Sequence, residues 1–253
     1  MSTILSSSTN LAERSVVINN GASRRFHQLL NHTPEVDLDY ADTQRRPEIE
    51  RYIADQFQTA YGAAISYFMP LMLSLRCNDQ LSAVTGICPA GNQPLFIEQY
   101  FEGSIEGEIN RFSVPPVTRE NIAEIGNLAA THHGASQLLF ILLASILHRA
   151  GFEWLIFTGT PQVQKSIGRL GFELHPIAEA HPLKINNFEI KNWGTYYDNK
   201  PYVVAGNLAH AMDTIGNRQL LKGMLSLYQN RIETLASLIS NERETNDQYY
   251  FAA

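Results

Sequence analysis

Cysteine is scarce in this sequence, which has only Cys77 and Cys88 in 253 residues. Disulfide-stapled secreted scaffolds contain many more, so we expect free, buried thiols and a reducing compartment. Charged residues are few as well, at 17%, and the net charge of −6 argues against general nucleic-acid binding. The 44% of hydrophobic residues is enough for a substantial core.

Long hydrophobic runs are also missing. The longest, Leu138–Leu147, has ten residues, about half of the ~20 that a membrane-spanning helix needs, so we expect a buried helix there. Residues 1–15 lack a basic stretch followed by a continuous apolar one and do not resemble a secretory signal. These absences predict a cytoplasmic protein without a stable membrane span.

Common catalytic motifs do not occur either. The sequence has no GxSxG, no Walker lysine loop and no GxGxxG. His132 and His133 are adjacent and lack the spacing of further ligands, so we expect no metal site. They could lie near a bound anion or be solvated loop residues. Direct transfer between two bound substrates is therefore favoured over covalent catalysis.

The sequence predicts a flexible N-terminus over residues 1–20, within which 14–19 could form a first strand. The hydrophobic patterns next predict a loop at 31–45, a helix from Pro47 to Gly62, a hairpin at 66–76 and 81–91, and a strand at 94–101. They then predict a short helix from Ser104, a strand at 120–130, a helix at 135–150, a central strand at 153–160, a helix at 161–171, and strands at 172–177 and within 193–211. This order indicates a mixed α/β sheet with helices on both faces. The glycine at 126 suggests a bulge or a separation between neighbouring strands.

Residues 218–240 form an amphipathic pattern in which apolar side chains alternate by four and three positions. Two interpretations stay open. The helix could dock on its own domain, or it could form a homodimer interface.

The stretch 124–136, "EIGNLAATHHGAS", contains the candidate site. Small residues precede the helix that starts near Gly134, where free backbone N–H groups could cradle a phosphate; a plain capped helix is the alternative. Glu124 lies in an apolar strand and could act as a general base, or it could pair with an arginine or lysine. Glu98, in a second predicted strand, could share its pocket. Tyr196 could orient a substrate or serve as packing.

Several blocks together resemble the bacterial family known as thermostable hemolysin. They are "AYGA" (60–63), "PLFIEQYF" (94–101), "AEIGNLAA" (123–130), "LHRAGFEWLIFTGT" (147–160), "RLGFEL" (169–174) and "WGTYYDNKPYVVAGNLAHA" (193–211). That family is related to GCN5-like N-acetyltransferases and to acyl-homoserine-lactone autoinducer synthases. The resemblance implies an acyltransferase fold, with a mostly antiparallel twisted sheet over residues 21–211 and a C-terminal helix and tail over 212–253.

In that fold the strand before the main helix diverges from its neighbour, and the pantetheine of the acyl donor lies in the gap. Carried over, the strand is 122–130 and the phosphate loop is 131–136. Of the usual glycine-rich loop only Gly134 and Ala135 are present, which leaves the donor open between acyl-CoA and the phosphopantetheine of an acyl carrier protein. The implied donor-binding residues are Asn127, Leu128, Ala129, Ala130, His133, Gly134, Ala135 and Ser136.

Autoinducer synthases carry Glu-x-x-Arg on the equivalent strand, whereas here Asn127 follows Glu124 at that spacing. The acid is kept and the arginine is not, which argues against lactone synthesis from S-adenosylmethionine. We therefore expect an enzyme that moves an acyl group from a thioester to a small amine or amino acid, with Glu124 as base. Two alternatives remain. The first is an acyltransferase fold recruited to binding or to other chemistry, which could use S-adenosylmethionine as autoinducer synthases do. The second is a membrane-active hemolysin.

Overall fold

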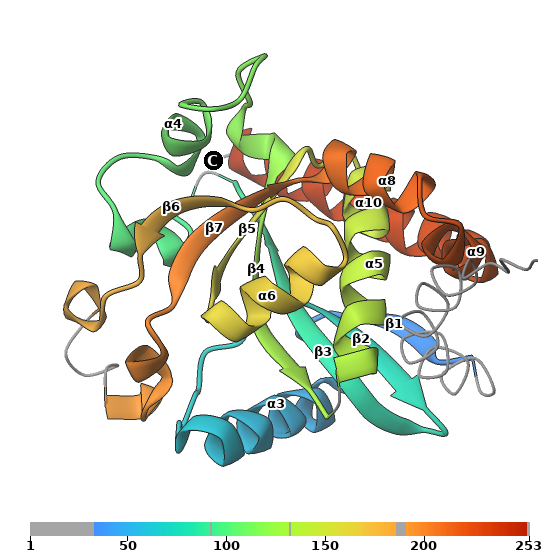
Figure 1. Ribbon diagram of the computed structural model, residues 1–253, viewed down its shortest axis with the longest axis horizontal. Coiled ribbons are helices and arrows are strands. Elements are labelled where there is room, and N and C mark those ends of the chain that lie inside the picture. The colour runs from blue at the N-terminus through green and yellow to red at the C-terminus, as the bar shows by residue number, and fades with distance from the viewer. Residues whose placement is uncertain (1–32, 92, 132, 186–190, 252–253) are drawn as a thin grey trace, which may run out of the picture.

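The computed structural model describes residues 33–91, 93–131, 133–185 and 191–251. The N-terminal segment 1–20, which the sequence predicts to be flexible, and the strand predicted at 14–19 lie outside these ranges. The described chain forms an α/β fold around one mixed sheet (Figure 1). Its strands are β1 (Glu35–Asp39), β2 (Leu71–Cys77), β3 (Gln80–Pro89), β4 (Ile122–Ala130), β5 (Trp154–Gly159), β6 (His175–Glu179) and β7 (Tyr202–Asn207).

The seven strands lie in the order β1-β2-β3-β4-β5-β7-β6. β4 and β5 are parallel, and every other neighbouring pair is antiparallel. β5 is therefore interior, as its apolar sequence predicts. The mixed, mostly antiparallel sheet agrees with the arrangement that the family resemblance implies.

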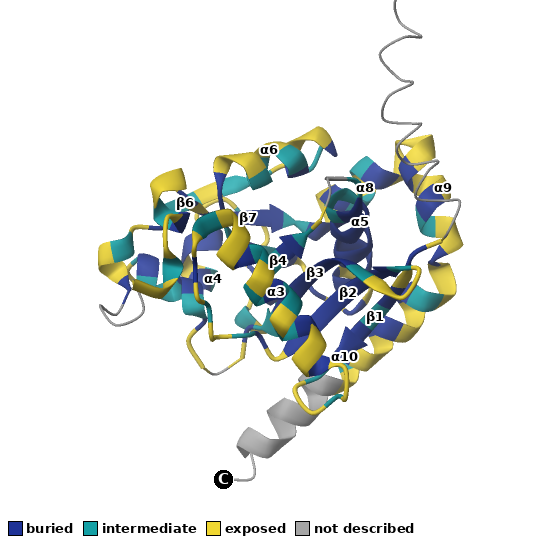
Figure 2. Cartoon of the chain, turned by 90° about the horizontal axis from the view of Figure 1, so that it is seen from below, coloured by how far each residue is buried: buried dark blue, intermediate teal, exposed yellow. Residues whose placement is uncertain are grey.

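Helices cover both faces of the sheet, and the strands beneath them are largely buried (Figure 2). They are α3 (Arg46–Tyr61), α4 (Ile105–Ile109), α5 (His133–Arg149), α6 (Pro161–Arg169), α8 (Leu208–Gly216), α9 (Gln219–Leu227) and α10 (Gln229–Phe251). The main hydrophobic core joins α5 and α8–α10 to one face. Two smaller clusters lie elsewhere: one is built on α3, and the other on residues 90–122 with β5 and β7.

Local sequence signals explain several element ends. Pro47 lies in the first turn of α3, and Gly62 ends that helix in the left-handed conformation at φ 64°. The Ser104 side chain accepts a hydrogen bond from the Gly107 N–H and caps α4. In the β2–β3 turn, Asn78 and Asp79 take positive φ values, as tight hairpins require.

Two sequence-based assignments are wrong. β1 lies within the predicted loop 31–45, because its aspartates gave this segment the composition of a loop. In the structure Val36 and Leu38 are buried, and Asp37 forms ion pairs with Arg45 and Arg231. Residues 94–101 are not a strand, because β4 already has β3 on one side and β5 on the other. They contain a 3-10 turn, η1 (Phe96–Tyr100), that lies outside the sheet.

The C-terminal pattern folds as two helices that meet at Tyr228. Its apolar stripe is buried in the main core of the same chain, at Leu221, Tyr228, Ile232, Leu235 and Ile239. This favours docking on its own domain, and the homodimer through residues 218–240 stays a prediction. None of the described helices is long and apolar enough to cross a membrane.

Candidate active site

Divergence of β4 from β5 creates the main pocket. The two strands pair only from Ile122–Ile125 to Trp154–Phe157. Beyond that point β4 continues beside β3 and β5 continues beside β7, and Figure 1 shows the two strands diverging. The separation that the resemblance implies for residues 122–130 is therefore present, with the starts of α5 and α6 beyond it.

A bulge in β4 begins the divergence. The β3–β4 register shifts between Val84 and Gly86, opposite Gly126. Asn127 follows with φ 48°, a conformation that asparagine tolerates better than most residues. Its side-chain oxygen accepts a hydrogen bond from the Met69 N–H at 2.9 Å, and its nitrogen donates to the Tyr67 carbonyl at 3.1 Å. Asn127 thus ties the segment before β2 to the pocket wall.

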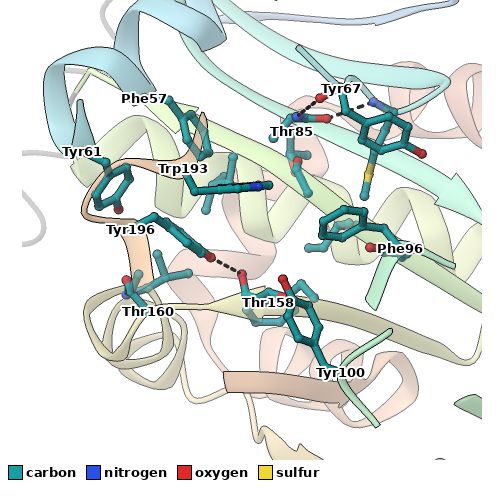
Figure 3. A pocket seen from close by; sticks show the side chains of 18 of the residues that line it. Phe57, Tyr61, Tyr67, Thr85, Phe96, Tyr100, Thr158, Thr160, Trp193 and Tyr196 are labelled. Atoms are coloured by element: carbon teal, nitrogen blue, oxygen red, sulfur yellow. Dashed lines mark hydrogen bonds between the residues drawn. The ribbon is translucent and has the colours of Figure 1, made fainter. Parts of the chain in front are cut away.

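The pocket has a cavity volume of about 110 Å³ and is surrounded mainly by aromatic rings (Figure 3). The rings come from α3, the segment after it, η1, α5, β5 and the loop before β7, so the pocket lies where the three hydrophobic clusters meet. The aromatic lining residues are Phe57, Tyr61, Tyr67, Phe96, Tyr100, Phe140, Phe157, Trp193 and Tyr196.

Glu124 is the one carboxylate among the described residues that line this pocket. It is only 2% exposed, and its Oε2 accepts a hydrogen bond from the Phe96 N–H at 2.9 Å. Burial raises its pKa to about 8, against the opposing effect of the Phe96 and Ile97 N–H groups; the charge of Glu98 adds to the rise. A group that titrates near neutrality can hold or release a proton at the pocket wall.

Glu98 does not join Glu124 in the pocket lining, contrary to the sequence-based expectation. Arg119 binds both of its oxygens at 2.7 Å, and the N–H groups of Leu95 and Ile105 also donate to them. Burial alone would raise the pKa of Glu98, but these hydrogen bonds outweigh it and lower that pKa. Glu98 therefore anchors the η1 segment, and its catalytic role stays a prediction.

Tyr196 does lie in the pocket, where it is buried, and its hydroxyl donates to the Thr158 carbonyl at 3.3 Å. A second pair, Tyr100 and Tyr197, shares a hydrogen bond of 2.6 Å between hydroxyls. Burial raises the pKa values of Tyr100 and Tyr196 far above the ordinary range. Both hydroxyls therefore stay protonated and can act as hydrogen-bond donors.

The structure places the residues predicted to bind the acyl donor in different surroundings. Asn127 and Leu128 line the pocket, whereas Ala129 and Ala135 are buried in hydrophobic clusters. Ala130, Gly134 and Ser136 are half-buried. The side chain of His133 and the whole of His132 lie outside the described parts of the chain. Donor binding by this set stays a prediction.

Sequence reasoning missed most of the aromatic lining. Sequence patterns indicated Tyr196 as a site residue but not Phe57, Tyr61 or Trp193. The structure joins them through the backbone: the Thr195 N–H donates to the Tyr61 carbonyl at 2.8 Å, and the Ala64 N–H to the Asn192 carbonyl at 2.7 Å. No local pattern links positions so far apart in the chain.

Comparisons with known proteins return solved structures and one family. The fold is similar to the acyl-homoserine-lactone synthase LasI (TM-score 0.48, 12% identity, 70% of this chain and 91% of that one). It is also similar to FeeM, an N-acyl amino acid synthase from uncultured soil microbes (TM-score 0.48, 17% identity, 75% of this chain and 98% of that one). BjaI, a CoA-dependent acyl-homoserine-lactone synthase solved with SAM and isopentyl-CoA, is similar with a TM-score of 0.48 and 11% identity. This match covers 79% of this chain and 89% of that one.

No curated protein matches the chain. The family model described as thermostable hemolysin matches residues 40–212, which is more than half of the sequence, and the protein therefore belongs to the thermostable hemolysin family.

Proposed function

We propose that this protein is an N-acyltransferase that moves an acyl group from a thioester to an amine, with Glu124 as general base. The observation that carries the proposal is a buried carboxyl group of raised pKa on the wall of a pocket between two diverging strands. Such a group suits proton removal from an amine, whose nitrogen must lose a proton as it forms an amide.

In the proposed reaction the nitrogen lone pair forms a bond to the thioester carbonyl carbon, and the carbonyl π electrons move to oxygen. Glu124 takes a proton from the nitrogen. The intermediate then collapses: the carbonyl re-forms, the carbon–sulfur bond breaks with its electron pair on sulfur, and the sulfur takes up a proton. The products are an amide and a thiol, so no further reactant is needed. Tyr100 is a protonated donor in the same pocket that can orient a substrate, whereas Tyr196 already donates its proton to the Thr158 carbonyl and can offer its oxygen as an acceptor.

A small apolar cavity behind the main pocket bears on the donor half of the proposal, because its volume of about 30 Å³ could hold only the end of an acyl chain. This second cavity, almost wholly apolar, lies between α5, α6, α8 and β5. It shares Ile125, Phe140 and Phe157 with the main pocket, so these side chains separate the two spaces. The donor's pantetheine is proposed to lie in the β4–β5 gap, with its acyl group reaching this partition. Both acyl-CoA and acyl carrier protein remain candidate donors.

The test is incubation of the purified protein with amines and a panel of acyl-CoA and acyl-carrier-protein thioesters, read by thiol release and product mass. We expect thiol release that depends on the amine and is lost in Glu124→Gln. The matched control is Glu233→Gln on the exposed side of α10, which should retain the wild-type rate. Unchanged turnover in Glu124→Gln would remove the assigned base, and no turnover with any donor would favour a fold recruited for binding.

A further inference from the structure

The charge of the pocket wall restricts the acceptor. Of the described residues that line the main pocket, none is lysine, arginine or histidine, and Glu124 is the only one besides the tyrosines that can ionise. Arg119, on the segment behind η1, is already bound by Glu98, Glu106 and backbone carbonyls. A ligand carboxylate in this space would therefore lose its hydration without a cation to replace it, and Glu124 would repel it whenever Glu124 is ionised.

The rings favour the opposite charge. Trp193 and Tyr196 lie with centroids 5.2 Å apart, and Tyr196 meets Tyr61 edge-on at 5.2 Å. Phe57 packs against Trp193 at 6.3 Å, and Phe96 approaches Trp193 from the other side at 6.1 Å (Figure 3). Aromatic walls attract organic cations through the negative charge of the ring faces, most strongly where water is excluded. They also bury apolar ligand groups well.

From these two observations we infer that the acyl acceptor is a hydrophobic amine that binds as a cation and carries no carboxylate, such as an arylalkylamine, rather than an amino acid. The inference rests on the proposed acyl transfer only in naming the amine as the acyl acceptor. Selective binding of the amine itself does not require turnover. The hydrophobic body lies among the rings, and the ammonium group points to Glu124.

Binding then activates the base. In the empty pocket at neutral pH, Glu124 is mostly protonated, since its pKa is raised to about 8. An ammonium group beside it favours the ionised form and lowers that pKa. Amine binding should therefore expel the proton of Glu124 to the buffer. The resulting carboxylate then takes one proton from the bound ammonium group, which frees the nitrogen lone pair for attack. The second proton that the nitrogen loses as the amide forms goes to the departing sulfur.

The inference is tested by isothermal titration calorimetry of the full chain without any acyl donor. The ligands are phenethylamine, phenylalanine and phenylalaninamide, which share the ring and the amine. We expect phenethylamine and phenylalaninamide to bind at least about tenfold more tightly than phenylalanine, a difference of ~1.4 kcal/mol. Equal or tighter binding of phenylalanine, or no binding by any of the three, would overturn the inference.

Proton release provides a second readout. Titrations of phenethylamine at pH 7 in buffers of different ionisation enthalpy should show close to one proton released per site, and Glu124→Gln should release none.

Trp193→Leu, checked for an unchanged melting temperature, should weaken the binding of phenethylamine more than the binding of the uncharged analogue phenylethanol. Equal weakening of the two would contradict a cation–π contribution. Selective amine binding without turnover would defeat the proposed function alone, and acyl transfer to phenylalanine at the rate seen with phenethylamine would defeat this inference alone.

Discussion

Replacing Glu124 by glutamine should make the stability of this protein less sensitive to pH. Burial raises the pKa of this carboxyl from 4.5 to about 8, so the folded chain keeps a proton that the unfolded chain releases near pH 4.5. Between these values unfolding releases a proton, and the free energy of unfolding of the wild type falls as the pH rises. Glutamine resembles the protonated acid in shape and hydrogen bonding and does not titrate.

The size of the effect follows from the same two pKa values. Each pKa unit corresponds to ~1.4 kcal/mol. Integration from pH 5 to pH 8 shows that the titration of Glu124 lowers the free energy of unfolding of the wild type by about 3–4 kcal/mol. The difference in unfolding free energy between Glu124→Gln and wild type should therefore grow by that amount in favour of the variant and level off above about pH 8. Urea denaturation at several pH values measures it.

Glu98→Gln is the matched control, because Glu98 is also largely buried but its pKa is lowered by Arg119 and the backbone. It is ionised in both the folded and the unfolded chain across this pH range, so its substitution should cost a constant amount. If the Glu124→Gln difference is as flat as that of Glu98→Gln, then Glu124 is not desolvated in the folded protein, and the basis of its proposed role is lost.

Further predictions concern activity and the pocket walls. With Glu124 as base, kcat/KM should rise with pH and level off above about pH 8; a pH-independent rate with a fully soluble donor would contradict this. Phe140→Leu, which opens the partition between the two cavities, should shift the preference within an acyl-CoA series toward longer chains in a thiol-release assay. Asn127→Gly keeps the positive φ accessible but removes two hydrogen bonds, and should lower the unfolding free energy by about 1–3 kcal/mol in urea. Gly194→Ala places a Cβ against the Tyr61 carbonyl at a positive φ, and should lower the melting temperature by several degrees, corresponding to roughly 1–3 kcal/mol.

The parts of the fold that depend on local signals could be predicted from the sequence. Helix α3 follows from Pro47, an apolar stripe and Gly62. The β2–β3 turn follows from Asn78 and Asp79. The divergence of β4 was expected from a glycine within an apolar strand, and the structure places a register shift opposite Gly126. In each case the deciding residues are neighbours in the chain.

Features decided by distant partners could not be predicted. Residues 94–101 have a strand-like composition, and only the position of Arg119 and the occupied edges of β4 explain why they form a turn. An apolar stripe such as that of 218–240 has the same pattern whether it packs on its own sheet or on a second copy. The aromatic lining is a property of the folded chain, since Phe57, Phe96 and Trp193 come from three separate segments.

Arg119 gives the site a point of adjustment that lies outside the pocket. Its guanidinium binds Glu98 and the carbonyls of Gly91 and Gln93, and so it fastens the segment whose Phe96 N–H reaches Glu124. The hydrogen bond that favours the ionised form of Glu124 therefore comes from the η1 segment that Arg119 holds, and not from the sheet. A change at Arg119 would alter the basicity of Glu124 and would also shift the Phe96 and Tyr100 rings that η1 contributes to the lining, while the diverging strands kept their course. The basicity of the acid and one wall of the pocket are therefore coupled in this architecture.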